Sequence, residues 1–250
     1  MSSRRRRWWL LAAVLTVIDA AGCSATSTSK SLESQPAPSP APSSTSPAGT
    51  LTPTTTVAEA GFESSVAPID EAATARMSAS WRPGCPVALE ALRLITLTHW
   101  GFDGAVHSGE LVVHADGAEA VVAVFEALFE QRFPIEQVRL VDEFGGDDDQ
   151  SMAANNTSAF NCRLVTGSQS WSEHAYGRAI DINPVQNPFV TRSGAVLPPE
   201  GAAHTRRDPS IPGLITADGP VVTAFRAVGW EWGGDWSGGK DYQHFSATGR

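Results

Sequence analysis

A stretch rich in Ser, Thr and Pro divides this chain and limits which part of it can fold. Residues 24–57 contain 23 Ser, Thr or Pro among 34 positions and no aromatic residue. Such a segment cannot bury enough apolar surface to offset the entropy lost on ordering. We therefore interpret 24–57 as a linker and expect one folded domain over residues 58–250. With 42% hydrophobic residues in the whole chain, that domain can bury a sizeable core.

The segment before the linker has the organisation of an export signal. Arg4–Arg7 form a basic block, the apolar run Trp8–Ile18 follows, and the small residues 20–22 lead into Cys23. A basic start, a short apolar run and small residues before a processing point are the parts of a secretory signal. Small residues before a Cys also resemble the lipobox of bacterial lipoproteins. We predict a signal peptide over 1–23 with lipidation of Cys23; the alternative is an ordinary cleaved signal with an incidental Cys.

The charge balance bears on the partners of the protein. The formal net charge is −9, and removal of residues 1–22 leaves 14 basic and 26 acidic residues, a net charge of −12. Nothing after the N-terminus gathers Lys or Arg into the stripe that nucleic-acid binding requires, so we expect no nucleic-acid partner. We expect a monomer outside the cytoplasm. The predicted lipid would anchor it to the outer face of the bacterial cell membrane, and without the lipid it would be secreted.

The hydrophobic pattern predicts helices and strands that do not alternate regularly. The expected helices are 68–79, 117–133 and 221–228, and the expected strands are 92–98, 109–114, 138–141 and 179–182. An irregular order of this kind favours an α+β fold over a doubly wound sheet. The acidic triplet 147–149 lacks the spaced oxygen ligands of a calcium loop, so we expect a solvent-exposed loop there.

Two cysteines, Cys85 and Cys162, remain once Cys23 is assigned to the lipid anchor. Outside the cytoplasm, two such cysteines usually pair. A reactive thiolate or a metal ligand would need a His or a second Cys at short spacing, and neither is present. We predict a disulfide between Cys85 and Cys162.

The residues that could perform chemistry lie in two short segments of the C-terminal half. Asp181 belongs to the predicted strand 179–182, and Gly177 permits a turn that brings His174 beside that strand. Together with His244, these side chains would supply three zinc ligands. The fourth tetrahedral position would be left to a water molecule, whose pKa zinc lowers to about 7. Spacing alone leaves open the ordinary interpretation of each as a core or surface histidine.

A carboxylate close to the same segment could act as a general base. Asp241 lies three residues before His244, close enough to reach the water without binding the metal. Asp235 and Glu231 lie in the same Gly- and Trp-rich segment and are the alternatives.

Two patterns resemble the zinc peptidases of bacterial cell walls. They are Ser-x-His-x-x-Gly-x-Ala-x-Asp over 172–181 and Asp-x-x-His over 241–244. That family includes D-alanyl-D-alanine carboxypeptidases of the vancomycin-resistance type and phage L-alanyl-D-glutamate endopeptidases. The resemblance covers about residues 85–246 and includes Asn155–Arg163, Asp181–Pro184, Asn187–Pro188 and Gly229–Gly234. It implies a single domain with the small α+β zinc fold that hedgehog signalling domains share.

The resemblance also implies a mechanism. Zn²⁺ would be held by His174, Asp181 and His244, with Asp241 as the base and later the proton donor. The expected function is hydrolysis of peptidoglycan stem peptides, most closely as a D-alanyl-D-alanine carboxypeptidase. The alternatives are an endopeptidase of the L-alanyl-D-glutamate type and a non-catalytic wall-binding module on the same fold.

Members of this family use an Arg upstream of the first His to bind substrate and stabilise the oxyanion. Arg163 is our candidate, with Arg139 and Arg178 as alternatives. Ser172 is a further candidate, either for substrate binding or for a local structural role. A carboxypeptidase needs a cation to receive the terminal carboxylate of its substrate, whereas an endopeptidase must leave that end open.

Overall fold

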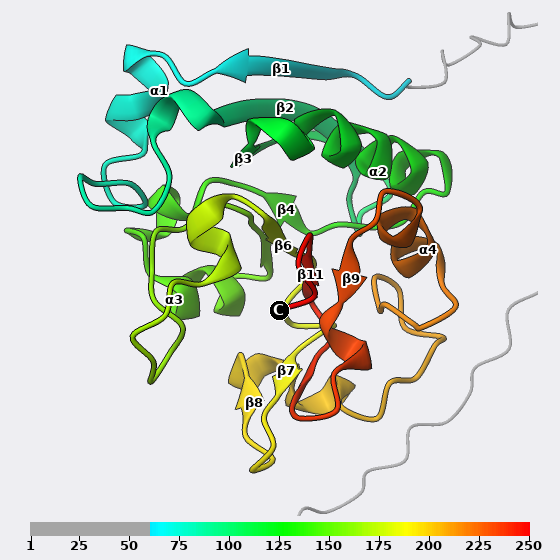
Figure 1. Cartoon of the computed structure of the whole chain (residues 1–250). Coiled ribbons are helices and arrows are strands. Elements are labelled where there is room, and N and C mark those ends of the chain that lie inside the picture. The colour runs from blue at the N-terminus through cyan, green and yellow to red at the C-terminus, as the bar shows by residue number, and fades with distance from the viewer. Residues whose placement is uncertain (1–60) are drawn as a thin grey trace, which may run out of the picture. The chain divides into compact units, whose positions relative to one another are not determined.

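Two long strands organise the N-terminal half of the folded region (Figure 1). β2 (Leu92–Trp100) pairs antiparallel with β3 (Val106–His114) on one side and with β1 (Ser64–Pro68) on the other. This computed structural model describes residues 61–250, which lie in one compact unit. The predicted signal peptide, the linker and Cys23 lie outside the described residues.

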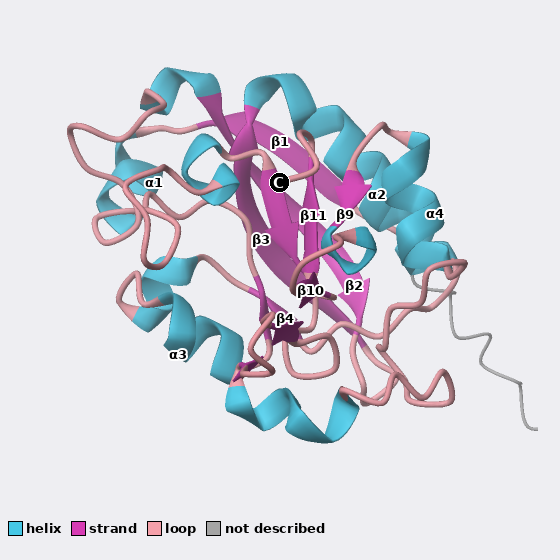
Figure 2. Ribbon diagram, turned by 60° about the horizontal axis from the view of Figure 1, so that its bottom comes forward, coloured by secondary structure: helices cyan, strands magenta, loops and turns pink. Residues whose placement is uncertain are grey.

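A second antiparallel sheet lies in the C-terminal half. Its order is β6 (Ala179–Asp181), β11 (His244–Ser246) and β9 (Glu231–Trp232), with β11 in the centre. The register pairs His244 directly with Asp181. Figure 2 shows the strands of the molecule gathered in the middle and the helices at the periphery. The ladder therefore brings together two residues that are far apart in the sequence.

The remaining elements are short. They are α1 (Glu71–Arg76), α3 (Asp148–Ala153), β4 (Gln137–Val138), β5 (Asn156–Thr157), β7 (Phe189–Val190), β8 (Val196–Leu197) and β10 (Lys240–Asp241). β4 pairs parallel with β5, and β7 lies between β8 and β10. Helices and strands do not alternate, so the predicted α+β class is confirmed.

Two predicted elements differ from the structure. The helix expected over 68–79 is limited to α1: it begins after Asp70, whose side chain caps it by accepting a hydrogen bond from the Ala73 N–H, and it ends at Arg76. The strand expected over 138–141 ends at Val138. Beyond it, the side chain of Asn156 takes the place of a strand, accepting from the Arg139 N–H and donating to the Arg139 carbonyl.

The acidic triplet 147–149 does not form the exposed loop that we expected. Asp147 is the N-cap of α3, where its side chain accepts a hydrogen bond from the Gln150 N–H at 3.1 Å. Asp148 and Asp149 form the first turn of that helix, where acidic side chains interact favourably with the helix dipole. An N-cap residue with two acids after it is therefore a helix start that the sequence analysis missed.

The predicted disulfide is confirmed. Cys85 and Cys162 are bonded, and the bond closes a loop between positions 77 residues apart. A loop of that length corresponds to about 4 kcal/mol of stabilisation when the bond is treated as a restriction of the unfolded chain. The disulfide also fixes the backbone next to Arg163.

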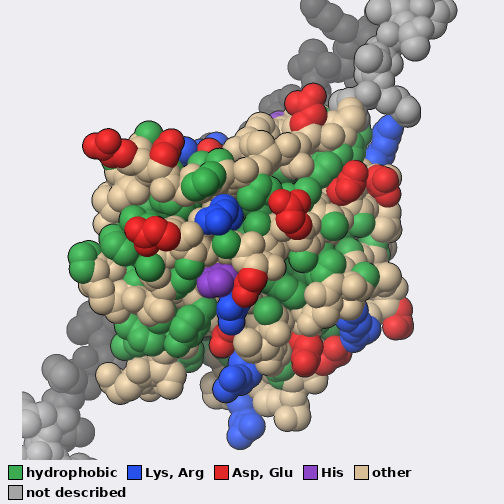
Figure 3. All heavy atoms as spheres, turned by 45° about the horizontal axis from the view of Figure 1, so that its top comes forward, with side chains coloured by type: hydrophobic (Ala, Val, Ile, Leu, Met, Phe, Trp, Pro, Cys, Tyr) green, Lys and Arg blue, Asp and Glu red, His purple; other side chains and the backbone are tan. Residues whose placement is uncertain are grey.

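Acidic, basic and apolar side chains are interspersed on the face shown in Figure 3. Within residues 61–250, no helix combines the length and the hydrophobicity that crossing a bilayer requires.

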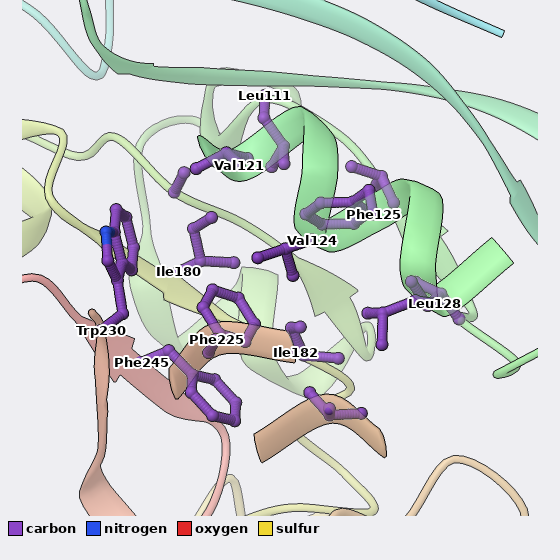
Figure 4. Packing of buried hydrophobic residues seen from close by; sticks show 14 of the residues in the cluster. Leu111, Val121, Val124, Phe125, Leu128, Ile180, Ile182, Phe225, Trp230 and Phe245 are labelled. Carbon is purple, nitrogen blue, oxygen red and sulfur yellow. The ribbon is translucent and has the colours of Figure 1, made fainter. Parts of the chain in front are cut away.

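One hydrophobic core joins the two halves of the folded region. α2 (Ala118–Glu130) contacts both β2 and α4 (Pro220–Ala227). The buried face of α2 has the helical spacing that the sequence predicts. Figure 4 shows its side chains packed with those of the second sheet and α4, including Val121, Phe125, Ile180, Phe225 and Phe245. This core supports β6 and β11, which carry residues of the candidate site.

Candidate metal centre

The structure brings together the three residues that the sequence analysis proposed as metal ligands. His174 lies in a 3-10 turn (Glu173–Tyr176), Asp181 ends β6, and His244 begins β11. One donor atom from each lies within 4.8 Å of the others, and all three side chains are buried. This cluster is the one group of its kind found among residues 61–250.

A glycine turn places His174 beside the sheet. Gly177 ends the 3-10 turn with a φ of +67°, a left-handed conformation that favours glycine. A Cβ atom at this position would lie 2.6 Å from the backbone nitrogen of His114. The chain therefore requires glycine here for two reasons, conformation and close approach.

We expect Gly177→Ala to lower the free energy of unfolding by roughly 2–4 kcal/mol, because it combines left-handed strain with a backbone clash. Gly104→Ala is the matched control. Gly104 has a φ of +74° and nothing within 4 Å of the added Cβ, so only the strain of about 1–2 kcal/mol applies. Chemical denaturation of both variants measures the difference, and equal losses would show that the close approach to His114 is unimportant.

The donor atoms lie close enough to one another to share one zinc ion. His174 Nε2 lies 3.3 Å from His244 Nδ1 and 3.2 Å from Asp181 Oδ2. His244 Nδ1 lies 3.0 Å from Asp181 Oδ1. Zinc bonds of about 2.0–2.1 Å in tetrahedral geometry separate neighbouring ligand atoms by roughly 3.3 Å.

Outer hydrogen bonds orient both imidazoles towards the carboxylate. His174 Nδ1–H donates to the Ala159 carbonyl at 2.6 Å, and His244 Nε2–H donates to the Arg250 carbonyl at 3.0 Å. These bonds leave a lone pair on His174 Nε2 and on His244 Nδ1, the two atoms that face Asp181. Two imidazole lone pairs and a carboxylate converging in a buried site need a shared cation. The donor set therefore fits Zn²⁺.

The pKa shifts of Asp181 and His244 agree with a site that binds a cation. Burial opposes ionisation of Asp181, but the facing imidazoles of His174 and His244 outweigh it and hold the pKa of the carboxyl well below its usual range. Burial also opposes protonation of His244, but the hydrogen bond and charge of Asp181 raise its pKa to about 9.

Asp241 is the candidate base that reaches this site. Its carboxyl lies in the wall of the pocket described below, and its Oδ1 is enclosed without a hydrogen-bond partner. Burial raises the pKa of Asp241 to about 7. The two alternatives lie elsewhere, since Asp235 forms an ion pair with Arg226 at 2.7 Å and Glu231 is exposed outside the pocket.

A pocket of about 780 Å³ opens over the cluster. Both polar and apolar side chains line it, including Asp148, Arg163, Val165, Trp171, Phe189, Leu197, Trp236 and Gln243. The Trp236 ring lies 5.4 Å from the His244 ring, measured between centroids. Trp230 and Trp232 belong instead to the hydrophobic core.

Of the three candidate arginines, Arg163 lines the pocket. Arg139 pairs with Glu143 at 2.9 Å, and Arg178 pairs with Asp116 at 2.7 Å, in both cases outside the pocket lining. Arg163 is therefore the candidate that the structure places where a substrate could meet it.

Ser172 also lines the pocket, and its side chain has a structural contact. The Oγ atom accepts a hydrogen bond from the His174 N–H at 3.3 Å and so caps the 3-10 turn. The sequence analysis missed two other polar residues of the pocket, Asp148 and Gln243. Asp148 pairs with Arg163 at 2.7 Å, and Gln243 is buried with its Oε1 unpartnered.

The comparisons with known proteins agree with the geometry. Residues 166–247 match a family model described as D-alanyl-D-alanine carboxypeptidase. This family consists of zinc peptidases. The matched segment contains His174, Asp181, Asp241 and His244. No curated protein and no solved structure matched the chain significantly.

Proposed function

We propose, from the premise that residues 166–247 belong to the D-alanyl-D-alanine carboxypeptidase family of zinc peptidases, that this protein hydrolyses peptidoglycan stem peptides. The observation that carries the proposal is the buried convergence of His174, Asp181 and His244 at the floor of the pocket. A carboxypeptidase that removes a terminal D-Ala is the specificity we propose. Arg163 supports it, because a cation in the pocket wall can receive a terminal carboxylate.

Each residue has a defined task in this mechanism. A zinc ion held by the three ligands would supply a water molecule of lowered pKa and would polarise the scissile carbonyl. Asp241 accepts the proton of the attacking water and returns it to the leaving amine. Burial raises the pKa of the Asp241 carboxyl, which makes it a stronger base for the first transfer. The Arg163 guanidinium binds the substrate and stabilises the developing oxyanion.

The outer contacts keep the site in a single arrangement. The Ala159 and Arg250 carbonyls hold the imidazoles of His174 and His244 in the tautomers that ligation needs. Trp236 covers one side of His244, which limits the access of bulk water to that ligand.

The proposal extends to the fold of the protein and to its location. We propose the hedgehog-type zinc fold for residues 58–250 and an extracytoplasmic location with a lipid on Cys23. The substrate lies outside the cell membrane, so an anchored enzyme would be held beside it. The described region is also proposed to act as a monomer without a nucleic-acid partner.

Mass spectrometry of purified muropeptides incubated with the zinc-loaded protein tests the function. We expect loss of a terminal D-Ala from pentapeptide stems. Release of a longer fragment would instead show the endopeptidase, and a folded, zinc-loaded protein that cleaves no stem peptide would show a wall-binding module. The same protein treated with a chelator is the control and should be inactive.

A further inference from the structure

Three consecutive aspartates at the start of α3 have three different environments. Asp147 caps the helix, as described above. Asp149 lines the pocket but forms no ion pair among the described residues. Asp148 lies between them and forms an ion pair with Arg163, with 2.7 Å between Oδ2 and Nη2. This ion pair distinguishes Asp148 from its two neighbours.

The ion pair lies in the wall of the pocket and is largely shielded from solvent. The exposed fractions of the Arg163 and Asp148 side chains are 27% and 24%, and both residues line the pocket. A carboxylate shielded to this extent is retained as a charge only with a partner. Arg163 is that partner, across 15 positions of sequence.

Both ends of the Arg163 side chain are held. Its backbone follows Cys162, which is bonded to Cys85, and its carbonyl accepts a hydrogen bond from the Ser172 N–H at 3.1 Å. Its guanidinium is held through Nη2 by Asp148. The Nε atom is buried and has no hydrogen-bond partner. The guanidinium is therefore held through one nitrogen, while 27% of the side chain stays exposed in the wall of the pocket.

We propose that Asp148 is a positioning residue for Arg163. It holds the guanidinium through Nη2, so that the exposed part of the Arg163 side chain keeps one place in the pocket wall, where it can meet an oxygen of the substrate, a carboxylate or the carbonyl under attack. The proposal rests on the proposed function, in which Arg163 binds the substrate. Asp148 itself need not touch the substrate. Its effect comes from restricting a long side chain that would otherwise occupy several rotamers.

The first test changes the Asp148 side chain and measures kcat/KM on the stem peptide. Asp148→Asn keeps the size of the side chain but removes its charge, and we expect kcat/KM on the stem peptide to fall about 10- to 100-fold, as misplacement of a binding group does. Asp148→Glu retains a carboxylate and should recover part of the loss. Glu143→Gln removes the carboxylate from another ion pair, the one with Arg139 outside the pocket lining; it is the matched control and should have little effect.

The zinc content and the thermal midpoint of unfolding separate positioning from damage to the fold. Asp148→Asn should retain its zinc, because no ligand is changed. A rise in KM indicates a lost contact to the ground-state substrate, and a fall in kcat indicates a lost contact to the oxyanion; both support positioning. A loss of zinc or a large drop in the thermal midpoint would overturn it.

A double-mutant cycle makes the test specific. If Asp148 acts through Arg163, then Asp148→Asn should cause no further loss in an Arg163→Ala background. A loss of the same size in both backgrounds would overturn the proposal, as would an Asp148→Asn protein that is as active as Glu143→Gln. A zinc-loaded wild type that cleaves no stem peptide would instead overturn the proposed function itself, and the positioning role with it.

Discussion

Loss of bound zinc is the expected result of His174→Ala and of His244→Ala. Each substitution removes one of three donors and leaves two, which is fewer than the three protein ligands of a catalytic zinc site. It also leaves the Asp181 carboxylate buried beside a single imidazole. Metal analysis after dialysis should find stoichiometric zinc in the wild type and almost none in either variant, and peptidase activity should fall to background.

The control for this experiment is a histidine outside the pocket. His107 pairs with Asp103 at the start of β3, so His107→Ala should retain both zinc and activity. Circular dichroism should show that all three variants are folded. Stoichiometric zinc in both His174→Ala and His244→Ala would refute the assignment of the ligands.

Asp241→Asn should lower the rate of hydrolysis without releasing the metal. The amide has nearly the size of the carboxyl but cannot accept a proton from the attacking water. General-base catalysis contributes about 10²- to 10⁴-fold, so kcat should fall by that order. Zinc should stay bound, because the side chains of His174, Asp181 and His244 are unchanged.

The pH profile gives a second measure of the same role. The base must be ionised, so kcat/KM of the wild type should rise with pH through the pKa of Asp241. That pKa is about 7 in the metal-free protein and lower beside a bound cation. Asp235→Asn, which changes an acid outside the pocket, should leave the rate and the profile unaltered. An Asp241→Asn protein that loses zinc or keeps most of its activity would contradict the assignment.

The pattern of apolar residues along the chain correctly predicted a helix at α2 and a strand at β2. The spacing of apolar residues in α2 and the β-prone run of β2 each meet a buried surface with the expected period. The same patterns failed for 138–141, where the side chain of Asn156, 17 positions beyond Arg139, replaces a strand partner. Periodicity along the chain contains no information about that partner.

For the candidate site, too, the sequence predicted some features and left others open. By itself, the sequence identified His174, Asp181 and His244 as candidate zinc ligands. The spacing of His174, Gly177 and Asp181 predicted a turn and a strand, and the resemblance to zinc peptidases favoured the three residues as a ligand set. Only the tertiary structure decided which acid and which arginine accompany them. Asp235 pairs with Arg226 outside the pocket lining, so this acid does not face the cluster of His174, Asp181 and His244.

The contact of Asp148 with Arg163 could not be predicted from the sequence. Within the sequence it is one of three adjacent aspartates with no pattern that distinguishes it from its neighbours. The rotation of α3 directs Asp148 towards Arg163, while Asp147 caps the helix and Asp149 forms no ion pair within residues 61–250. The sequence determined the chemical nature of each side chain. The partner of each charge depends on the packing of segments that are distant along the chain, and only the tertiary structure decided it.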